Sequence, residues 1–230
     1  MADKKQVVQE ATGGDDVIIK AKDFWQRNAK VISIALLLVI VLGGGWFVYN
    51  HYFKKPKEAE AMDKLFKAED YFRQDSINLA LNGDGQNLGF LKIISKYSGT
   101  DAANMANFYA GSCYIKLDDN EKAVTYLKKF SSDAKQIQAR AYKLLGDAYG
   151  DLGKGSEALD YYTKAAHHFE ADKQASAEAL FSAAYLAQHI LNKPDQAIKL
   201  YKELKEKYPM TQQGFEVDKY LAQLGEYNAN

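Results

Sequence analysis

The stretch AYKLLGDAYGDLGKGSEALDYYTKAA, from Ala141 to Ala166, reads as two helices joined by a glycine-containing turn. Gly146 and Tyr149 lie three residues apart in its first half, and Ala158 and Tyr162 lie four apart in its second half. Each pair therefore falls on one helix face. Two antiparallel helices approach closely only where a side chain is small, so Gly146 and Ala158 predict a tight helical hairpin.

The same pattern recurs on both sides of this stretch. Upstream, YAGSCYIKLDDNEKAVTYLKKF places Gly111 and Tyr114 where Gly146 and Tyr149 stand, and the tyrosine-to-alanine step is nine residues in both copies. A looser third copy follows, and its loop is one residue longer. The matching residues of this copy are Leu180, Ala184, Ala187, Ala197, Tyr201, Leu204 and Pro209. Because each hairpin leaves an apolar face for the next, several hairpins must stack.

These patterns set the expected boundaries of a helical domain over residues 56–230. We expect a degenerate hairpin at 57–97, broken by the turn Asn82-Gly83-Asp84-Gly85, with a second helix from Gln86 to Tyr97. No stretch alternates with period two for long enough to form a strand, so the predicted fold class is all-α. The predicted repeats cover about 104–135, 139–172 and 177–209, and a capping helix covers 212–225.

A membrane segment is expected near the N-terminus. Residues from Val31 to Tyr49 carry no charge, and about 19 helical residues reach roughly 28 Å, close to the thickness of the hydrocarbon core. Aromatic residues flank the run, as is typical of the interface. A cleaved signal peptide is the alternative, but its n-region would be unusually long and no small-x-small cleavage site follows. We predict an uncleaved transmembrane signal anchor over 23–55.

The orientation of this anchor is predicted from size and weak charge bias. Basic residues occur on both sides of the span, so the positive-inside signal is small. A polar tail at 1–22 ahead of a large C-terminal domain favours a disordered cytoplasmic N-terminus and a periplasmic repeat domain in the bacterial inner membrane. The run Gly43-Gly44-Gly45 either allows another helix to approach closely or has no role in helix contacts.

Composition and motifs argue against several classes of function. Lysine plus arginine and aspartate plus glutamate both number 30, so no net field attracts nucleic acid. Cys113 is a single cysteine, expected in the core, and His167-His168 point about 100° apart on a helix, which disfavours a shared metal. Neither glycine run forms a phosphate loop. We therefore expect no catalytic, metal or cofactor site and no small-molecule substrate.

The repeat spacings resemble the tetratricopeptide repeat family over about residues 104–209. This resemblance implies a stack of helical hairpins that binds other proteins. The layout of tail, anchor and repeat domain also resembles the YfgM-like family of ancillary subunits of the bacterial Sec translocon, which work with a membrane-anchored periplasmic chaperone-isomerase. The degenerate first hairpin and the tyrosine-rich repeats look like the anchored repeat proteins of Bacteroidota. No motif here allows functional residues of these families to be carried over.

In stacked repeats, the first helix of each pair lines the concave side, which predicts a protein-binding groove. Its aromatic side chains exceed what a solvated face needs, so a segment with apolar side chains could dock there. Alternatively, these rings pack between hairpins or under the C-terminal helix. Two basic residues of the set, Arg140 and Lys143, could hold a carboxylate. The predicted groove residues are Met105, Phe108, Ser112, Arg140, Lys143, Asp147, Phe181, Tyr185 and His189.

The leading functional hypothesis is a translocon-associated scaffold that recruits a chaperone or receives emerging exported chains. The alternative is an adaptor subunit of another envelope complex, such as outer-membrane assembly, cell division or a secretion system. An enzyme with an atypical site in the first hairpin would need converging ionisable residues, which the sequence does not show. A self-associating structural protein would instead change its mass with concentration.

Overall fold

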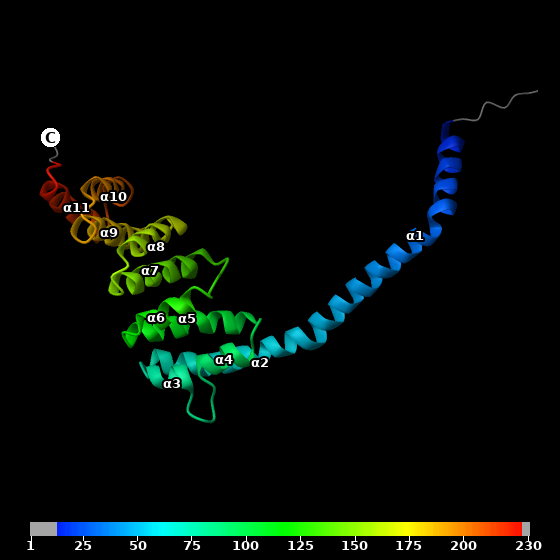
Figure 1. Ribbon diagram of the computed structural model, residues 1–230, viewed down its shortest axis with the longest axis horizontal. Helices are drawn as coiled ribbons and strands as arrows, with labels where there is room; N and C mark the ends of the chain where they lie inside the picture. Colours follow the sequence, from blue (N-terminus) through cyan, green and yellow to red (C-terminus); the bar gives the residue numbers. More distant parts are fainter. Residues whose placement is uncertain (1–12, 227–230) are drawn as a thin grey trace, which may run out of the picture. The chain divides into compact units, whose positions relative to one another are not determined.

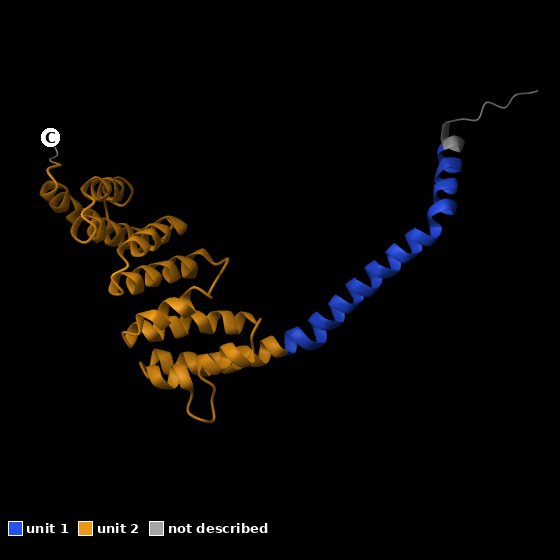
Figure 2. Cartoon of the chain, viewed as in Figure 1, with its two compact units in different colours: residues 1–56 blue, residues 57–230 orange. Residues whose placement is uncertain are grey.

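The computed structural model describes residues 13–226, and within this range the chain is helical and contains no strand. The all-α prediction is therefore confirmed. The chain divides into two compact units, residues 1–56 and 57–230, which are coloured separately in Figure 2. Each unit is described by itself below.

The first unit contains α1, Gly13–Tyr49, followed by a short π-helix, η1, Asn50–Lys54. Its helix is long and apolar enough to cross a membrane, and side chains such as Ile40 and Leu42 are uncovered by the rest of the chain. Residues 13–22 of the tail predicted to be disordered over 1–22 are instead the first turns of α1, which runs on without a break into the apolar segment. Residues 1–12 of that prediction lie outside the described residues.

The second unit is a series of helical hairpins. Figure 1 shows them following one another in chain order, from α2 to α11, and contacts join consecutive helices from α3 onward. Its helices are α2 (Lys55–Arg73), α3 (Ile77–Asn82), α4 (Phe90–Lys96), α5 (Asp101–Lys116), α6 (Asn120–Leu127), α7 (Lys135–Asp151), α8 (Gly155–His168), α9 (Lys173–His189), α10 (Pro194–Lys207) and α11 (Gln212–Gln223).

Small residues mark the crossing points of the hairpins. A Cβ atom on Gly111 of α5 would overlap Leu127 of α6, and one on Gly146 of α7 would lie 2.5 Å from Cδ1 of Tyr162 on α8. Ala184 in α9 is fully buried in the same role. The large side chain of one helix therefore occupies the space that a side chain at the glycine would fill.

The degenerate hairpin is attached to the repeats through its charged side chains. Glu58 of α2 accepts hydrogen bonds from the backbone N–H groups of Asp101 and Ala102, at 2.9 and 3.0 Å, so its carboxylate caps the N-terminus of α5. Thr100 adds its side-chain oxygen, which accepts from the N–H of Ala103 at 3.1 Å. These contacts satisfy three of the amide groups that a helix start leaves unpaired.

The helix expected from Gln86 to Tyr97 is shorter in the structure and starts at Phe90. The preceding residues form a loop closed by a bridge between Gly83 and Leu88. Asp84 holds this loop by accepting hydrogen bonds from the N–H groups of Gln86 and Asn87, at 2.8 and 2.6 Å. These bonds lower the pKa of its carboxyl group well below the usual range.

The core of the second unit is built from alanine, leucine and aromatic side chains of successive helices. Cys113 on α5 is fully buried within it. Burial raises the pKa of its thiol to about 12, so the group stays protonated and unreactive. This agrees with a packing role for Cys113.

Two glycines one turn apart on α7 test the close-packing argument. The Gly146→Ala substitution should lower the free energy of unfolding by about 1–3 kcal/mol, because the added methyl group collides with the Tyr162 ring. Gly150→Ala is the matched control, since its Cβ would lie 3.8 Å from the Tyr162 hydroxyl oxygen. Gly150→Ala should raise the free energy of unfolding by up to about 1 kcal/mol, because alanine has a higher helix propensity than glycine. Urea unfolding that moves both variants in the same direction would contradict the argument.

Candidate protein-binding groove

A groove with a cavity volume of ≈ 750 Å³ lies in the second unit, along the first helices of the hairpins. Its walls come from α2, α5, α7 and the start of α9, together with Ala165 at the end of α8 and the connection between α8 and α9. These helices line one surface because each hairpin presents its first helix on the same side. The lining residues are Glu69, Phe72, Arg73, Phe108, Tyr109, Ser112, Gln136, Ile137, Ala139, Arg140, Lys143, Leu144, Ala165, Phe169, Asp172, Ala175, Ser176 and Glu178.

Aromatic side chains supply much of the apolar lining. Phe72 of α2 and Phe108 of α5 both contact Tyr109, with ring centroids 5.4 and 5.5 Å apart. Phe108 is only 5% exposed and also packs against Phe130, so it anchors the lining to the core. Because these rings are fixed by their neighbours, the groove offers a rigid apolar surface.

Charged residues at the edges of the groove are mostly paired. Lys143 of α7 contacts Asp147 at 3.2 Å and Glu178 of α9 at 3.1 Å, so it joins two repeats. Burial opposes its charge, but the two carboxylates outweigh this and raise the pKa of the Lys143 ammonium group. Arg73 of α2 likewise pairs with Glu69 at 3.7 Å, and with Asp70.

Arg140 is different from the other charged lining residues. It is exposed, and its guanidinium group has no hydrogen bond or ion pair with any residue in the range 13–226. Asp172, by comparison, caps α9 by accepting from the N–H of Ala175 at 3.1 Å. The groove therefore carries one unpaired cation, which would attract a carboxylate on a bound chain.

Four of the nine residues predicted for the groove line it, namely Phe108, Ser112, Arg140 and Lys143. Asp147 lies beside Lys143 and also accepts a hydrogen bond from the Tyr162 hydroxyl at 2.9 Å. The structure therefore brings four of the predicted residues together on α5 and α7, and Asp147 contacts one of them, Lys143, without lining the groove.

The other predicted residues lie outside the groove lining. Met105 is half-buried between two core clusters. Phe181 stacks edge-on against Tyr220 of α11, with centroids 5.0 Å apart, and Tyr185 contacts His189 at 4.3 Å. Phe181 and Tyr185 thus form an aromatic cluster with Tyr220 of the terminal helix, in which Phe181 is partly buried and Tyr185 remains exposed.

Sequence reasoning did not identify the contribution of α2 and of the α8–α9 connection. Glu69, Phe72 and Arg73 belong to the degenerate hairpin, in which Ala68 stands three residues before Tyr71 where two of the other repeats have glycine, so its register was not recognised. Phe169 lies between helices, where no periodicity applies. Phe72 falls at helical spacing with Leu65 in the sequence, and this was the available signal.

The chemistry of the groove is suited to binding. Its lining residues include no histidine or cysteine, and the hydroxyl of Ser112 donates to the carbonyl oxygen of Phe108 at 2.9 Å. A serine held in this way, with no neighbouring base, is not an activated nucleophile. Apolar surface, one free cation and paired edge charges are features of a surface that recognises a peptide segment.

The half-buried carboxylate of Glu69 gives a test of groove electrostatics. Burial raises its pKa above 4.5, against the opposing charge of Arg73, so ionised Glu69 disfavours the folded state. The stability that protonated Glu69 contributes is fully present below pH 4.5 and is lost as the pH rises through the raised pKa of the folded state. Glu69→Gln should therefore be more stable than the native chain at pH 7.

This difference in stability should close as the pH falls towards 4, because the protonated carboxyl group then resembles the amide. Urea midpoints at several pH values measure it, and the exposed Glu206 provides a Glu206→Gln control. A Glu69→Gln variant that is less stable at pH 7 would show that the Arg73 contact outweighs burial.

Comparison with known proteins agrees with this architecture. A tetratricopeptide repeat-like domain model matches residues 22–142, slightly more than half of the chain, and a tetratricopeptide repeat model matches residues 178–209. The imidazole glycerol phosphate synthase subunit HisF of Dehalococcoides mccartyi is 29% identical over 89 residues, which is 39% of this chain and 34% of that protein. The chain thus spans about a third of that relative, and so partial a match assigns no activity. The two family matches, together with the stacked hairpins, show that the chain belongs to the tetratricopeptide repeat-like domain family.

Proposed function

We propose that this protein is a membrane-anchored scaffold whose groove binds segments of partner proteins. The observation that carries this proposal is the groove itself, which combines rigid aromatic side chains with the unpaired guanidinium group of Arg140. Buried aromatic anchors and arginine are the residue types that contribute most to protein–protein binding energy. Helix α1 supplies the anchor in this proposal because it is long and apolar enough to span a bilayer.

The bound segment is proposed to carry apolar side chains next to a carboxylate. The apolar side chains would cover Phe72, Tyr109 and Ile137, and the carboxylate would pair with Arg140. A cavity of ≈ 750 Å³ has room for several side chains of an extended or helical segment.

The cellular setting is proposed from the layout of the chain. A span near the N-terminus followed by one large unit supports a single-pass inner-membrane protein with a cytoplasmic N-terminus and a periplasmic repeat domain. This layout is that of the YfgM-like ancillary factors, so the proposed partners are the Sec channel and an anchored periplasmic chaperone-isomerase. An adaptor of another envelope complex uses the same groove and differs only in the partner.

Site-specific photo-cross-linking in native membranes tests the groove and identifies the partner in one experiment. A photoreactive phenylalanine derivative is placed at the exposed Gln136, in the groove, or at the exposed Glu157 of α8, outside it, so that Arg140 is kept. We expect a protein adduct at position 136 that is absent at 157. Adducts of equal yield at both positions, or none at 136, would contradict groove binding.

The identity of the adduct then separates the two settings. Sec channel subunits or an anchored periplasmic chaperone support the translocon-associated scaffold, and subunits of another envelope complex support the adaptor. In co-purification, Arg140→Glu should weaken binding of the partner by about 1–2 kcal/mol, roughly tenfold in affinity, because an attraction to the carboxylate is replaced by a repulsion. If the Arg140→Glu variant recovers as much partner as the native protein, the bound segment carries no carboxylate that pairs with Arg140.

A further inference from the structure

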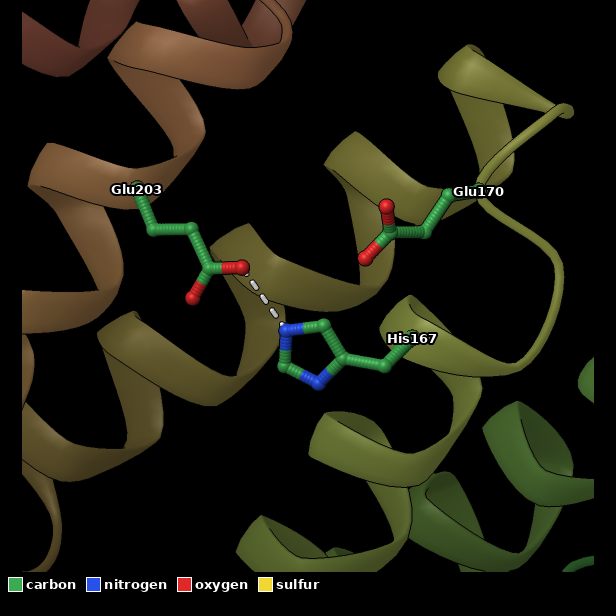
Figure 3. A group of neighbouring side chains, drawn as sticks. All are labelled: His167, Glu170 and Glu203. Carbon is green, nitrogen blue, oxygen red and sulfur yellow. Dashed lines mark hydrogen bonds and ion pairs between the residues drawn. The ribbon is translucent and has the colours of Figure 1, made fainter.

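Three side chains from two segments of the chain meet near the ends of the second helices of adjacent hairpins. His167 lies in the last turn of α8, Glu170 in the connection that follows, and Glu203 on α10. Figure 3 shows a nitrogen of the His167 ring directed at the Glu203 carboxylate, with the Glu170 carboxylate nearby. His167 Nε2 lies 2.8 Å from Glu203 Oε1, and one ligand atom from each of the three residues lies within 4.8 Å of the others.

This cluster already attracts a cation from within the chain. The ammonium group of Lys207 lies 2.9 Å from Glu170 Oε1 and 3.0 Å from Glu203 Oε1. Glu203 Oε1 also lies 2.8 Å from His167 Nε2, so the imidazole and the ammonium group both converge on this carboxylate.

We propose that His167, Glu170 and Glu203 form a binding site for a divalent transition-metal ion of the zinc type, which displaces the Lys207 ammonium group. One imidazole nitrogen and two carboxylate oxygens, completed by water, form a tetrahedral set that zinc accepts. Calcium and magnesium prefer oxygen ligands in larger number, so the imidazole selects against them. The C-terminal end of α8 adds a partial negative charge that favours a cation beside His167.

The geometry requires only side-chain adjustment. Zinc–nitrogen and zinc–oxygen distances are about 2.0–2.2 Å, so tetrahedral ligand atoms lie roughly 3.3 Å apart. The His167–Glu203 pair is already inside that separation, and the Glu170 carboxylate must move closer to both. Glu170 and Lys207 have side chains 45% and 40% exposed, so one can move in and the other can move into solvent without disturbing the core.

The competition with Lys207 gives the proposal a specific signature. Lys207→Met removes the resident cation and leaves both carboxylates uncompensated, so zinc should bind this variant several-fold more tightly than the native chain. His167→Ala should weaken binding about tenfold or more, because it removes the one nitrogen ligand. Glu206 is an exposed residue of α10 that lies outside the cluster. The Glu206→Gln substitution should therefore leave the zinc affinity unchanged.

Isothermal titration of zinc chloride into the full chain, in detergent and with any histidine tag removed, measures these affinities. Thermal unfolding with and without zinc provides the second readout, since an ion that binds only the folded state raises the unfolding temperature. We expect one ion per chain, with stabilisation in the native protein and Lys207→Met but not in His167→Ala. The metal-free unfolding temperature of each variant shows that it folds.

Four results would overturn the proposal. The first three are no zinc binding by either the native chain or Lys207→Met, equal affinity of His167→Ala and the native chain, and equal affinity for magnesium and zinc. A Lys207→Met variant that binds no more tightly than the native protein also contradicts it, because the ammonium group would then not occupy the metal position.

Discussion

The close approach of paired helices at a small residue is the constraint on which the second unit depends. At Gly146 the Tyr162 ring fills the space of the missing side chain, and at Gly111 Leu127 does the same. Such contact fixes the separation of the two helices in a hairpin, and hence the position of the apolar face that each hairpin offers to the next. Stacking then follows from burial of those faces, because no hairpin covers its own.

Repetition of this contact is what creates a groove. Each hairpin presents its first helix to the same side, so α2, α5, α7 and α9 line one surface although up to about a hundred residues separate their lining side chains. Lys143 and Glu178 join adjacent repeats across that surface at 3.1 Å. The groove is therefore rigid where repeats are tied together, and its one unpaired charge, on Arg140, is available to a bound chain.

Much of this architecture could be predicted from the sequence, and the limits have physical reasons. The spacing of glycine, tyrosine and alanine sets the helices of the repeats because close packing requires those residue types at those positions. It does not distinguish a ring that lines the groove from one that packs on a neighbour, since both lie on the same helices. Phe181 and Tyr185 were therefore predicted as groove residues, whereas both rings contact Tyr220 of α11 outside the groove lining. In the degenerate hairpin Ala68 replaces the glycine of two other repeats, so the register of Tyr71 was not recognised and Phe72 was not placed in the groove.

The cluster at His167 shows a second limit of the same kind. His167 and Glu203 are 36 residues apart, about one repeat, and a stack of hairpins brings nearby positions of successive second helices within reach of each other. A histidine at the end of one helix thus meets a carboxylate on the helix one repeat later. Motif reading searches for ligands a few residues apart and compared His167 with His168, whose ring instead packs against Tyr142 at 5.3 Å. In a repeat protein, polar sites must therefore be sought at the repeat spacing as well as at the helical one.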